Sequence, residues 1–163
     1  MTSVKNGEPL IVPFDLAHAD GVPAVLEAVC REYGFTWDDS PYFDDVRDVC
    51  RAYIERGGMF WVALDGPRVV GMIGVTPNSD LECELHRLYV LSEYRGRRLG
   101  QRLTDEVLHW ARRRGYGRIV LWSDVKLVHA HALYRANGFV QCGERMSDDP
   151  DRSREYGFCR ELA

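Results

Sequence analysis

One stretch of the chain, residues 85–100, restricts its fold more than any other. It reads LHRLYVLSEYRGRRLG, the pattern of an apolar-rich strand, a short basic loop with glycine, and the start of an amphipathic helix. The first backbone N–H groups of a helix have no internal partner, and the helix dipole favours negative charge there. Since Arg95, Arg97, Arg98 and Arg102 stand beside those groups, the stretch predicts a binding site for a phosphorylated cofactor.

A second strand follows this helix and fixes the local topology. The helix places Leu99, Leu103, Val107 and Trp110 on one face, and it ends before Gly115. Residues 118–122 (RIVLW) are apolar on both faces after the first residue, as in a buried central strand. A strand, a crossover helix and a second strand form a right-handed βαβ unit. The strands expected over 81–90 and 118–122 are therefore predicted to be parallel neighbours.

The remaining elements follow from periodicity and turn residues. We expect an edge strand over 10–14, a helix between a capping Asp20 and a stop at Gly34, a helix over 41–56, strands over 60–64 and 68–76, a helix over 128–137, and strands over 139–144 and 156–162 around a mobile loop over 145–154. This order predicts a single domain over residues 1–163 of the α/β (α+β) class. Its sheet is mixed and mostly antiparallel, with about seven strands, a central parallel pair and about four flanking helices.

Composition excludes several classes of protein. The formal net charge is −4, which argues against a nucleic-acid-binding domain built on the arginines at 95–102 and 112–114. The five cysteines are widely spaced and lack a C-x-x-C pair, so we expect reduced thiols, no metal site and a cytoplasmic protein. The first residues lack an apolar signal segment, and no run reaches membrane-spanning length.

Two motifs resemble those of the GNAT superfamily of N-acetyltransferases. Residues 90–100 resemble its acetyl-CoA loop, Gln/Arg-x-x-Gly-x-Gly/Ala: Arg95 and Gly100 match the ends, whereas Arg98 replaces the middle glycine and is expected to turn outward. Residues 130–139 (AHALYRANGF) resemble the family's A-x-x-L-Y-x-x-x-G-F, and residues 153–158 resemble the last strand of some bacterial members. The resemblance implies a GNAT-like fold with acetyl-CoA as co-substrate.

The same resemblance implies where that co-substrate binds. The backbone of one strand would pair with its pantetheine arm, and the basic loop and following helix would hold its phosphates. The implied residues are Leu88, Tyr89, Val90, Arg95, Gly96, Arg97, Arg98, Leu99, Gly100, Gln101 and Asn137.

Acetyl transfer to an amine needs a base for the amine and a proton for the departing thiolate. Strand alternation places Glu82, Glu84, His86, Leu88 and Val90 on one face. Glu84 is the candidate base, with a structural carboxylate as the alternative and His86 as a second candidate. Tyr134 is the candidate acid, because the family's tyrosine at this point lies near the thioester sulfur.

The acceptor is less well defined by the sequence. The aromatic residues Tyr33, Trp37, Tyr42 and Phe43 either cover the core or wall an acceptor pocket, to which Asp38 and Asp39 would attract a cation. We expect transfer by direct attack to a primary amine of a small molecule or an exposed peptide. A non-catalytic acyl-CoA-binding regulatory module is the alternative function, and assembly as a homodimer is left open.

Overall fold

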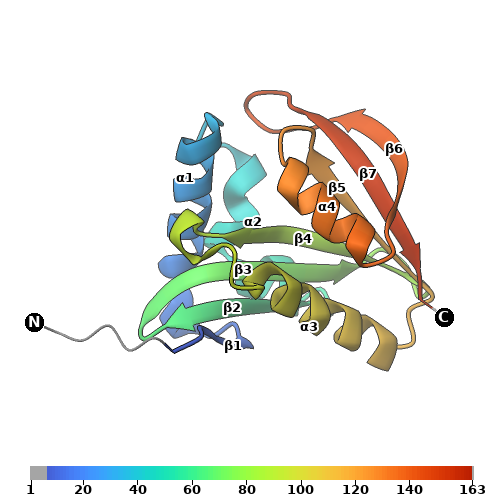
Figure 1. Ribbon diagram of the computed structural model, residues 1–163, viewed down its shortest axis with the longest axis horizontal. Coiled ribbons are helices and arrows are strands. Elements are labelled where there is room, and N and C mark those ends of the chain that lie inside the picture. Colours follow the sequence, from blue (N-terminus) through green and yellow to red (C-terminus); the bar gives the residue numbers. More distant parts are fainter. Residues whose placement is uncertain (1–6, 163) are drawn as a thin grey trace, which may run out of the picture.

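A seven-stranded sheet runs through the molecule in the order β1-β2-β3-β4-β5-β7-β6 (Figure 1). The computed structural model describes residues 7–162. Its strands are β1 (Leu10–Pro13), β2 (Met59–Asp65), β3 (Arg68–Pro77), β4 (Glu82–Val90), β5 (Arg118–Asp124), β6 (Val140–Met146) and β7 (Arg154–Glu161). Neighbouring strands are antiparallel except β4 and β5, which are parallel. The predicted mixed sheet and its central parallel pair are therefore confirmed.

Helices cover the two faces of this sheet unequally (Figure 1). The α-helices are α1 (Gly21–Tyr33), α2 (Asp44–Arg47), α3 (Leu99–Arg113) and α4 (Val128–Ala136), and the short turns are η1 (Leu16–His18), η2 (Pro41–Phe43), η3 (Cys50–Ile54) and η4 (Ser92–Tyr94). A Cβ at Gly71 would contact Leu103 of α3, whereas one at Gly74, on the opposite face of β3, would meet Tyr53 of η3. The α3 helix and the α2–η3 segment thus pack on opposite faces of the strand.

Three local predictions differ from the structure. The helix expected over 41–56 is broken into η2, α2 and η3, because Asp48 leaves the helical region with φ −143° and ψ 74°. Asp20 precedes α1 without a capping side-chain hydrogen bond, since its own backbone is already helical. Gly34 does end α1, in the left-handed conformation. The loop between β6 and β7 is shorter than expected, and the Ser147 N–H donates to the Ser153 carbonyl at 2.7 Å across it.

A β-bulge in β4 changes which side chains share a face. His86 pairs with Gly74 of β3, but Tyr89 pairs with Met72, so β4 holds one extra residue there, and Arg87 takes a positive φ of 55°. Paired residues on neighbouring strands project to the same face. Tyr89 therefore joins Glu84 and His86, whereas Val90 pairs with Gly71 and projects to the opposite face, so the prediction that Val90 shares their face is wrong.

The parallel pair ends halfway along β4. Its last paired residues are Leu85 and Leu121, after which β4 continues to Val90 while β5 continues to Asp124 beside β7. Beyond Leu85, the edge of β4 that faces β5 is consequently unpaired, and its backbone groups can accept an extended ligand as an added strand.

The bulge is fixed by a buried ion pair. Arg87 donates from Nε and Nη2 to the two carboxylate oxygens of Asp45 on α2, at 3.1 and 2.9 Å, and Nη2 also donates to the Tyr42 carbonyl. The Tyr53 hydroxyl donates to the same carboxylate at 2.6 Å. Burial raises the pKa of Asp45, but the Arg87 charge and these hydrogen bonds outweigh burial and hold it below its ordinary value.

Replacing Asp45 by Asn should destabilise the protein by about 3 kcal/mol at pH 7, because a buried guanidinium would lose its counter-charge. Since the folded-state pKa of Asp45 is lowered, its contribution is complete above the unfolded pKa near ~4 and is lost as pH falls through the folded value. Urea unfolding should therefore show a wild-type advantage that shrinks below about pH 4.

The matched control is Asp39→Asn, which removes a fully exposed carboxylate 3.9 Å from Arg47 and should change the unfolding midpoint little. Equal midpoints for Asp45→Asn and Asp39→Asn would show that the buried pair does not stabilise the bulge.

Candidate active site

Two cavities meet at the unpaired edge of β4. The first, of about 320 Å³, lies between the α1–η3 region and the half of the sheet formed by β5, β7 and β6. The second, of about 560 Å³, lies along the basic loop and the first turns of α3 and α4. Four residues line both: Val29, Leu88, Tyr89 and Leu127. A ligand in one cavity can therefore touch a ligand in the other.

The second cavity contains most of the predicted cofactor residues. Its lining includes Leu88, Tyr89, Val90, Arg95, Gly96, Arg98, Leu99, Gly100 and Gln101. The α3 helix begins at Leu99 with no side-chain cap on its first N–H groups, so these donors are available to an anion. The structure brings the predicted loop, helix start and strand edge together.

Arg98 stands at the N-cap of α3 with φ 59°. This left-handed conformation favours glycine, which explains why glycine is the usual residue at the matching position of the motif. The Arg98 side chain is exposed and lines the second cavity, as its expected outward orientation requires. Arginine therefore costs backbone strain here, and it places a cation beside the free N–H groups.

The other two arginines of the loop have protein partners. Arg95 donates to both carboxylate oxygens of Glu32 on α1, at 2.6 and 2.7 Å, and its Nε donates to the Val90 carbonyl at 3.1 Å. Arg97 lies over the ring of Tyr94 at 5.3 Å and lines neither cavity. Arg95 thus ties the loop to α1, whereas the guanidinium of Arg98 is the one of the three that is most available to a ligand in the second cavity.

Asn137 also lies outside both cavities. Its amide exchanges two hydrogen bonds with the Gln101 side chain, at 2.8 and 2.9 Å, and donates a third to the Leu133 carbonyl. The structure therefore shows Asn137 as a link between α3 and α4 behind the cofactor loop.

The candidate bases line the first cavity. His86 Nδ1 lies 4.0 Å from Glu84 Oε1, and His86 Nε2 is hydrogen-bonded to Thr76 Oγ1 at 2.8 Å. Burial raises the pKa of Glu84, and burial lowers the pKa of His86 to about 4. His86 is consequently neutral near pH 7, and Glu84 becomes a better proton acceptor than an ordinary exposed glutamate.

Tyr134 of α4 lines the same cavity. It packs between the rings of Phe139 and Phe158, at 5.8 and 5.7 Å, and only 5% of its surface is exposed. Burial raises the pKa of Tyr134, so its hydroxyl keeps its proton at neutral pH and can donate it.

The aromatic residues near α2 have mixed roles. Tyr42 and Phe43 line the first cavity and Tyr33 lines the second. Trp37 packs against Phe43 at 4.6 Å and lines neither cavity, so it covers the core. Asp38 and Asp39 also lie outside both linings. Tyr42 and Phe43 therefore wall a cavity and Trp37 covers the core, whereas the cavity linings give no support to the predicted role of Asp38 and Asp39.

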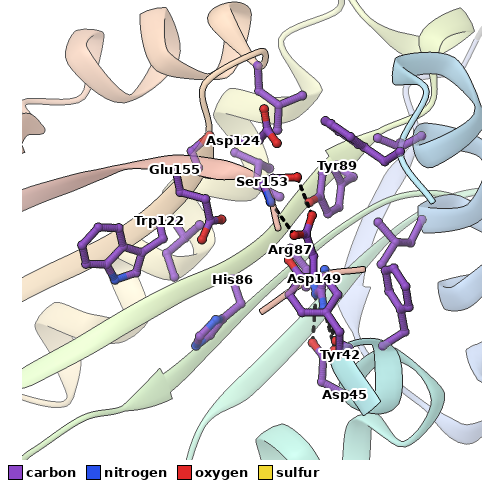
Figure 2. Close-up of a pocket in the computed structure, with 18 of the residues that line it drawn as sticks. Tyr42, Asp45, His86, Arg87, Tyr89, Trp122, Asp124, Asp149, Ser153 and Glu155 are labelled. Atoms are coloured by element: carbon purple, nitrogen blue, oxygen red, sulfur yellow. Dashed lines mark hydrogen bonds and ion pairs between the residues drawn. The ribbon is translucent and has the colours of Figure 1, made fainter. Parts of the chain in front are cut away.

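Sequence reasoning missed the wall formed by β5 and β7 (Figure 2). Trp122, Asp124 and Glu155 all line the first cavity. The burial of β5 alternates, with Val120, Trp122 and Asp124 only half buried, so the expectation that both of its faces are buried is wrong. The C-terminal motif contained Glu155, but its partners come from other strands.

Glycines on β6 and β7 seat the indole of Trp122. A Cβ added at Gly157 would lie 2.9 Å from Cζ3 of Trp122, whereas one at Gly143 would lie 3.4 Å from Cη2. Neither glycine has a positive φ. Both positions therefore owe their glycine to the space that the indole takes rather than to backbone conformation.

Within residues 7–162, no group of three or more His, Cys, Asp or Glu side chains is arranged to hold a metal ion. None of the helices in that part of the chain is both long enough and apolar enough to span a bilayer. All five cysteines carry free thiols.

Comparisons with known proteins identify the family. The model described as "Acetyltransferase (GNAT) family" matches residues 22–139, more than half of the chain. N-acetyltransferase 8 of Homo sapiens is 36% identical over 106 residues, which cover 61% of this chain and 47% of that protein. N-acetyltransferase 8 of Rattus norvegicus is 36% identical over 110 residues, covering 64% and 50%. The chain belongs to the GNAT family, and it spans about half the length of these curated relatives.

Solved structures confirm the GNAT fold. An acetyltransferase of Streptococcus agalactiae is 25% identical and superposes with a TM-score of 0.84 over 95% of this chain and 99% of its own. YncA of Salmonella typhimurium, solved with its cofactor acetyl-CoA, is 16% identical with a TM-score of 0.78 over 96% of this chain and 95% of its own.

Replacing Gly157 by Ala should destabilise the protein by about 1–3 kcal/mol, because the new methyl group would overlap the Trp122 ring. Urea unfolding followed by tryptophan fluorescence measures the effect. Gly143→Ala is the control, since it gains the same unfolded-state benefit but meets the indole at ordinary contact distance. Equal stability of the two variants would contradict the packing role assigned to Gly157.

Proposed function

We propose that this chain transfers the acetyl group of acetyl-CoA to a primary amine of a small molecule or an exposed peptide. The observation that carries the proposal is the meeting of two cavities at the unpaired edge of β4. One cavity has anion-binding groups and the other has proton-transfer groups. The five free thiols support a cytoplasmic location, where thiols stay reduced.

The second cavity fits acetyl-CoA. Uncapped N–H groups at the start of α3 and the exposed Arg98 suit phosphates. The free edge of β4 suits an amide-containing arm, and apolar residues such as Leu133 and Ala130 complete the lining. When bound, acetyl-CoA supplies an acetyl group activated as a thioester.

The residues of the first cavity act on protons. Glu84 removes a proton from the acceptor amine, directly or through water, and its raised pKa brings its basicity closer to that task. Backbone N–H groups of the 88–90 segment polarise the acetyl carbonyl. Tyr134, which holds its proton at neutral pH, donates to the departing sulfur.

Tyr134→Phe should lower kcat about a hundredfold, because the variant keeps the ring packing but loses the proton donor. The dissociation constant of acetyl-CoA, measured by calorimetry, should stay nearly unchanged. Tyr116→Phe is the control, since Tyr116 stacks on Trp110 and lines neither cavity. Wild-type turnover in Tyr134→Phe, with chemistry shown to limit the rate, would remove Tyr134 from this role.

Glu84→Gln should lower kcat/KM about a hundredfold and change its pH dependence. Glu84 accepts a proton only when ionised, so wild-type kcat/KM should rise with pH through the raised pKa of this carboxyl. The variant should lack that limb. His86 cannot produce the limb, because its pKa of about 4 lies lower.

Glu82→Gln is the matched control on the same strand, where Glu82 accepts a hydrogen bond from Asn78 at 3.0 Å and lines neither cavity. A wild-type pH profile in Glu84→Gln would refute Glu84 as the base. Tight acetyl-CoA binding without turnover across a panel of amines would instead indicate a non-catalytic acyl-CoA-binding module.

A further inference from the structure

One wall of the first cavity already holds a cation. The guanidinium of Arg145 on β6 lies 4.3 Å from the centre of the Trp122 ring, and its Nε donates to Glu155 Oε1 at 2.9 Å. All three residues line the cavity. An aromatic face together with a carboxylate is a favourable environment for a positively charged group.

The three side chains differ in how tightly the protein holds them. Glu155 is 8% exposed, and Trp122 is held against the glycines at 143 and 157. The Arg145 side chain is 46% exposed and comes from β6, the edge strand of the sheet. The carboxylate and the indole therefore form a fixed receptor, whereas the guanidinium is a movable occupant.

Charge in the cavity favours a further cation. The lining contains five carboxylates and three guanidinium groups: Asp45, Glu84, Asp124, Asp149, Glu155, Arg56, Arg87 and Arg145. One of the three cations, Arg87, is already neutralised by Asp45. The rest of the lining keeps more acidic than basic groups, so an acceptor with more than one positive charge complements it better than a monoamine.

We infer that Trp122 and Glu155 form a cation subsite in the first cavity, which is the acceptor cavity of the proposed reaction. Arg145 occupies this subsite in the free protein, and the distal ammonium group of a diamine or polyamine acceptor occupies it during turnover. This inference rests on the proposed acetyl transfer, because it gives that reaction its acceptor class. The acceptor carries its reacting amine at Glu84 and its distal ammonium at Trp122.

The strand register supports this spacing. Glu84 pairs with Val120 across the parallel pair, and Trp122 follows Val120 on the same face of β5. Two residues of a strand span roughly 7 Å, which is about the reach of a short α,ω-diamine. One flexible molecule can therefore place one nitrogen at Glu84 and the other at the indole.

Displacement of Arg145 costs little. The Arg145 side chain is already 46% exposed, so water solvates its guanidinium once it leaves the pair. Glu155, in contrast, is buried and needs a cationic partner. Burial raises the pKa of Glu155 and Arg145 opposes that rise, so an incoming ammonium group takes over the role that Arg145 leaves.

The test compares cadaverine with hexylamine, which carries a methyl group where cadaverine carries its second ammonium. Thiol release from acetyl-CoA should give a kcat/KM about tenfold higher for cadaverine, the effect expected of a partly desolvated cation on an indole. Trp122→Leu and Glu155→Gln should each bring the ratio of the two kcat/KM values close to one. Equal kcat/KM values for the two amines in the wild type would overturn the subsite.

The Arg145→Gln variant tests whether Arg145 competes with the acceptor for the Trp122–Glu155 subsite or only packs against it. The variant removes the internal competitor, so the cadaverine-to-hexylamine ratio should rise severalfold. The matched control is Arg154→Gln: Arg154 pairs with Glu144 at 2.5 Å on the same hairpin but does not line the cavity, so the ratio should not change. A lower ratio in Arg145→Gln, or a preference of the wild type for aminohexanoate, would make Arg145 a receptor for anions and overturn the inference.

Binding distinguishes this inference from the proposed function. Each amine is titrated calorimetrically into the protein saturated with coenzyme A. If no amine of the panel, these two included, is acetylated but cadaverine binds more tightly than hexylamine, the subsite stands and the proposed reaction fails. If hexylamine is acetylated and cadaverine is neither preferred nor bound more tightly, the reaction stands and the subsite fails. Equal or absent binding of both amines without turnover overturns both.

Discussion

The buried pair between Arg87 and Asp45 is the interaction on which the rest of the site depends. Asp45 lies on α2 and Arg87 lies at the bulge of β4, so one ion pair fixes both the broken helical segment and the strand. The bulge turns Tyr89 toward Glu84 and His86. Without the bulge, the strand would alternate regularly, and Tyr89 would lie on the opposite face from Glu84 and His86.

Unequal covering of the sheet explains why a cavity exists at all. The α3 and α4 helices cover one face, where His131 of α4 contacts Ser123 of β5. On the other face the helical segments reach β3 and β4, whereas the β5–β7–β6 half carries polar and aromatic side chains instead of a helix. The parallel strands separate after Leu85, which joins this open face to the cofactor side.

Local patterns allowed most of the fold to be predicted. Periodicity located every strand and the α1, α3 and α4 helices, and the βαβ rule gave the parallel pair. Non-local features were missed. The positive φ of Arg87 accompanies an ion pair with a carboxylate 42 positions away, and the helix breaks where the backbone of Asp48 leaves the helical region. The cavity wall requires Trp122, Arg145 and Glu155 from three strands, whereas Tyr134 lay within a motif of the family and Glu84 was located by strand alternation.

The division of the site between two parts of the chain has an evolutionary consequence. The match to the family model ends at residue 139, before the β6–β7 hairpin that carries Arg145, Glu155 and the two glycines under Trp122. The cofactor loop and the start of α3 lie inside the matched region. Substitutions in the hairpin can therefore change the acceptor subsite without altering the loop and helix start that bind the cofactor.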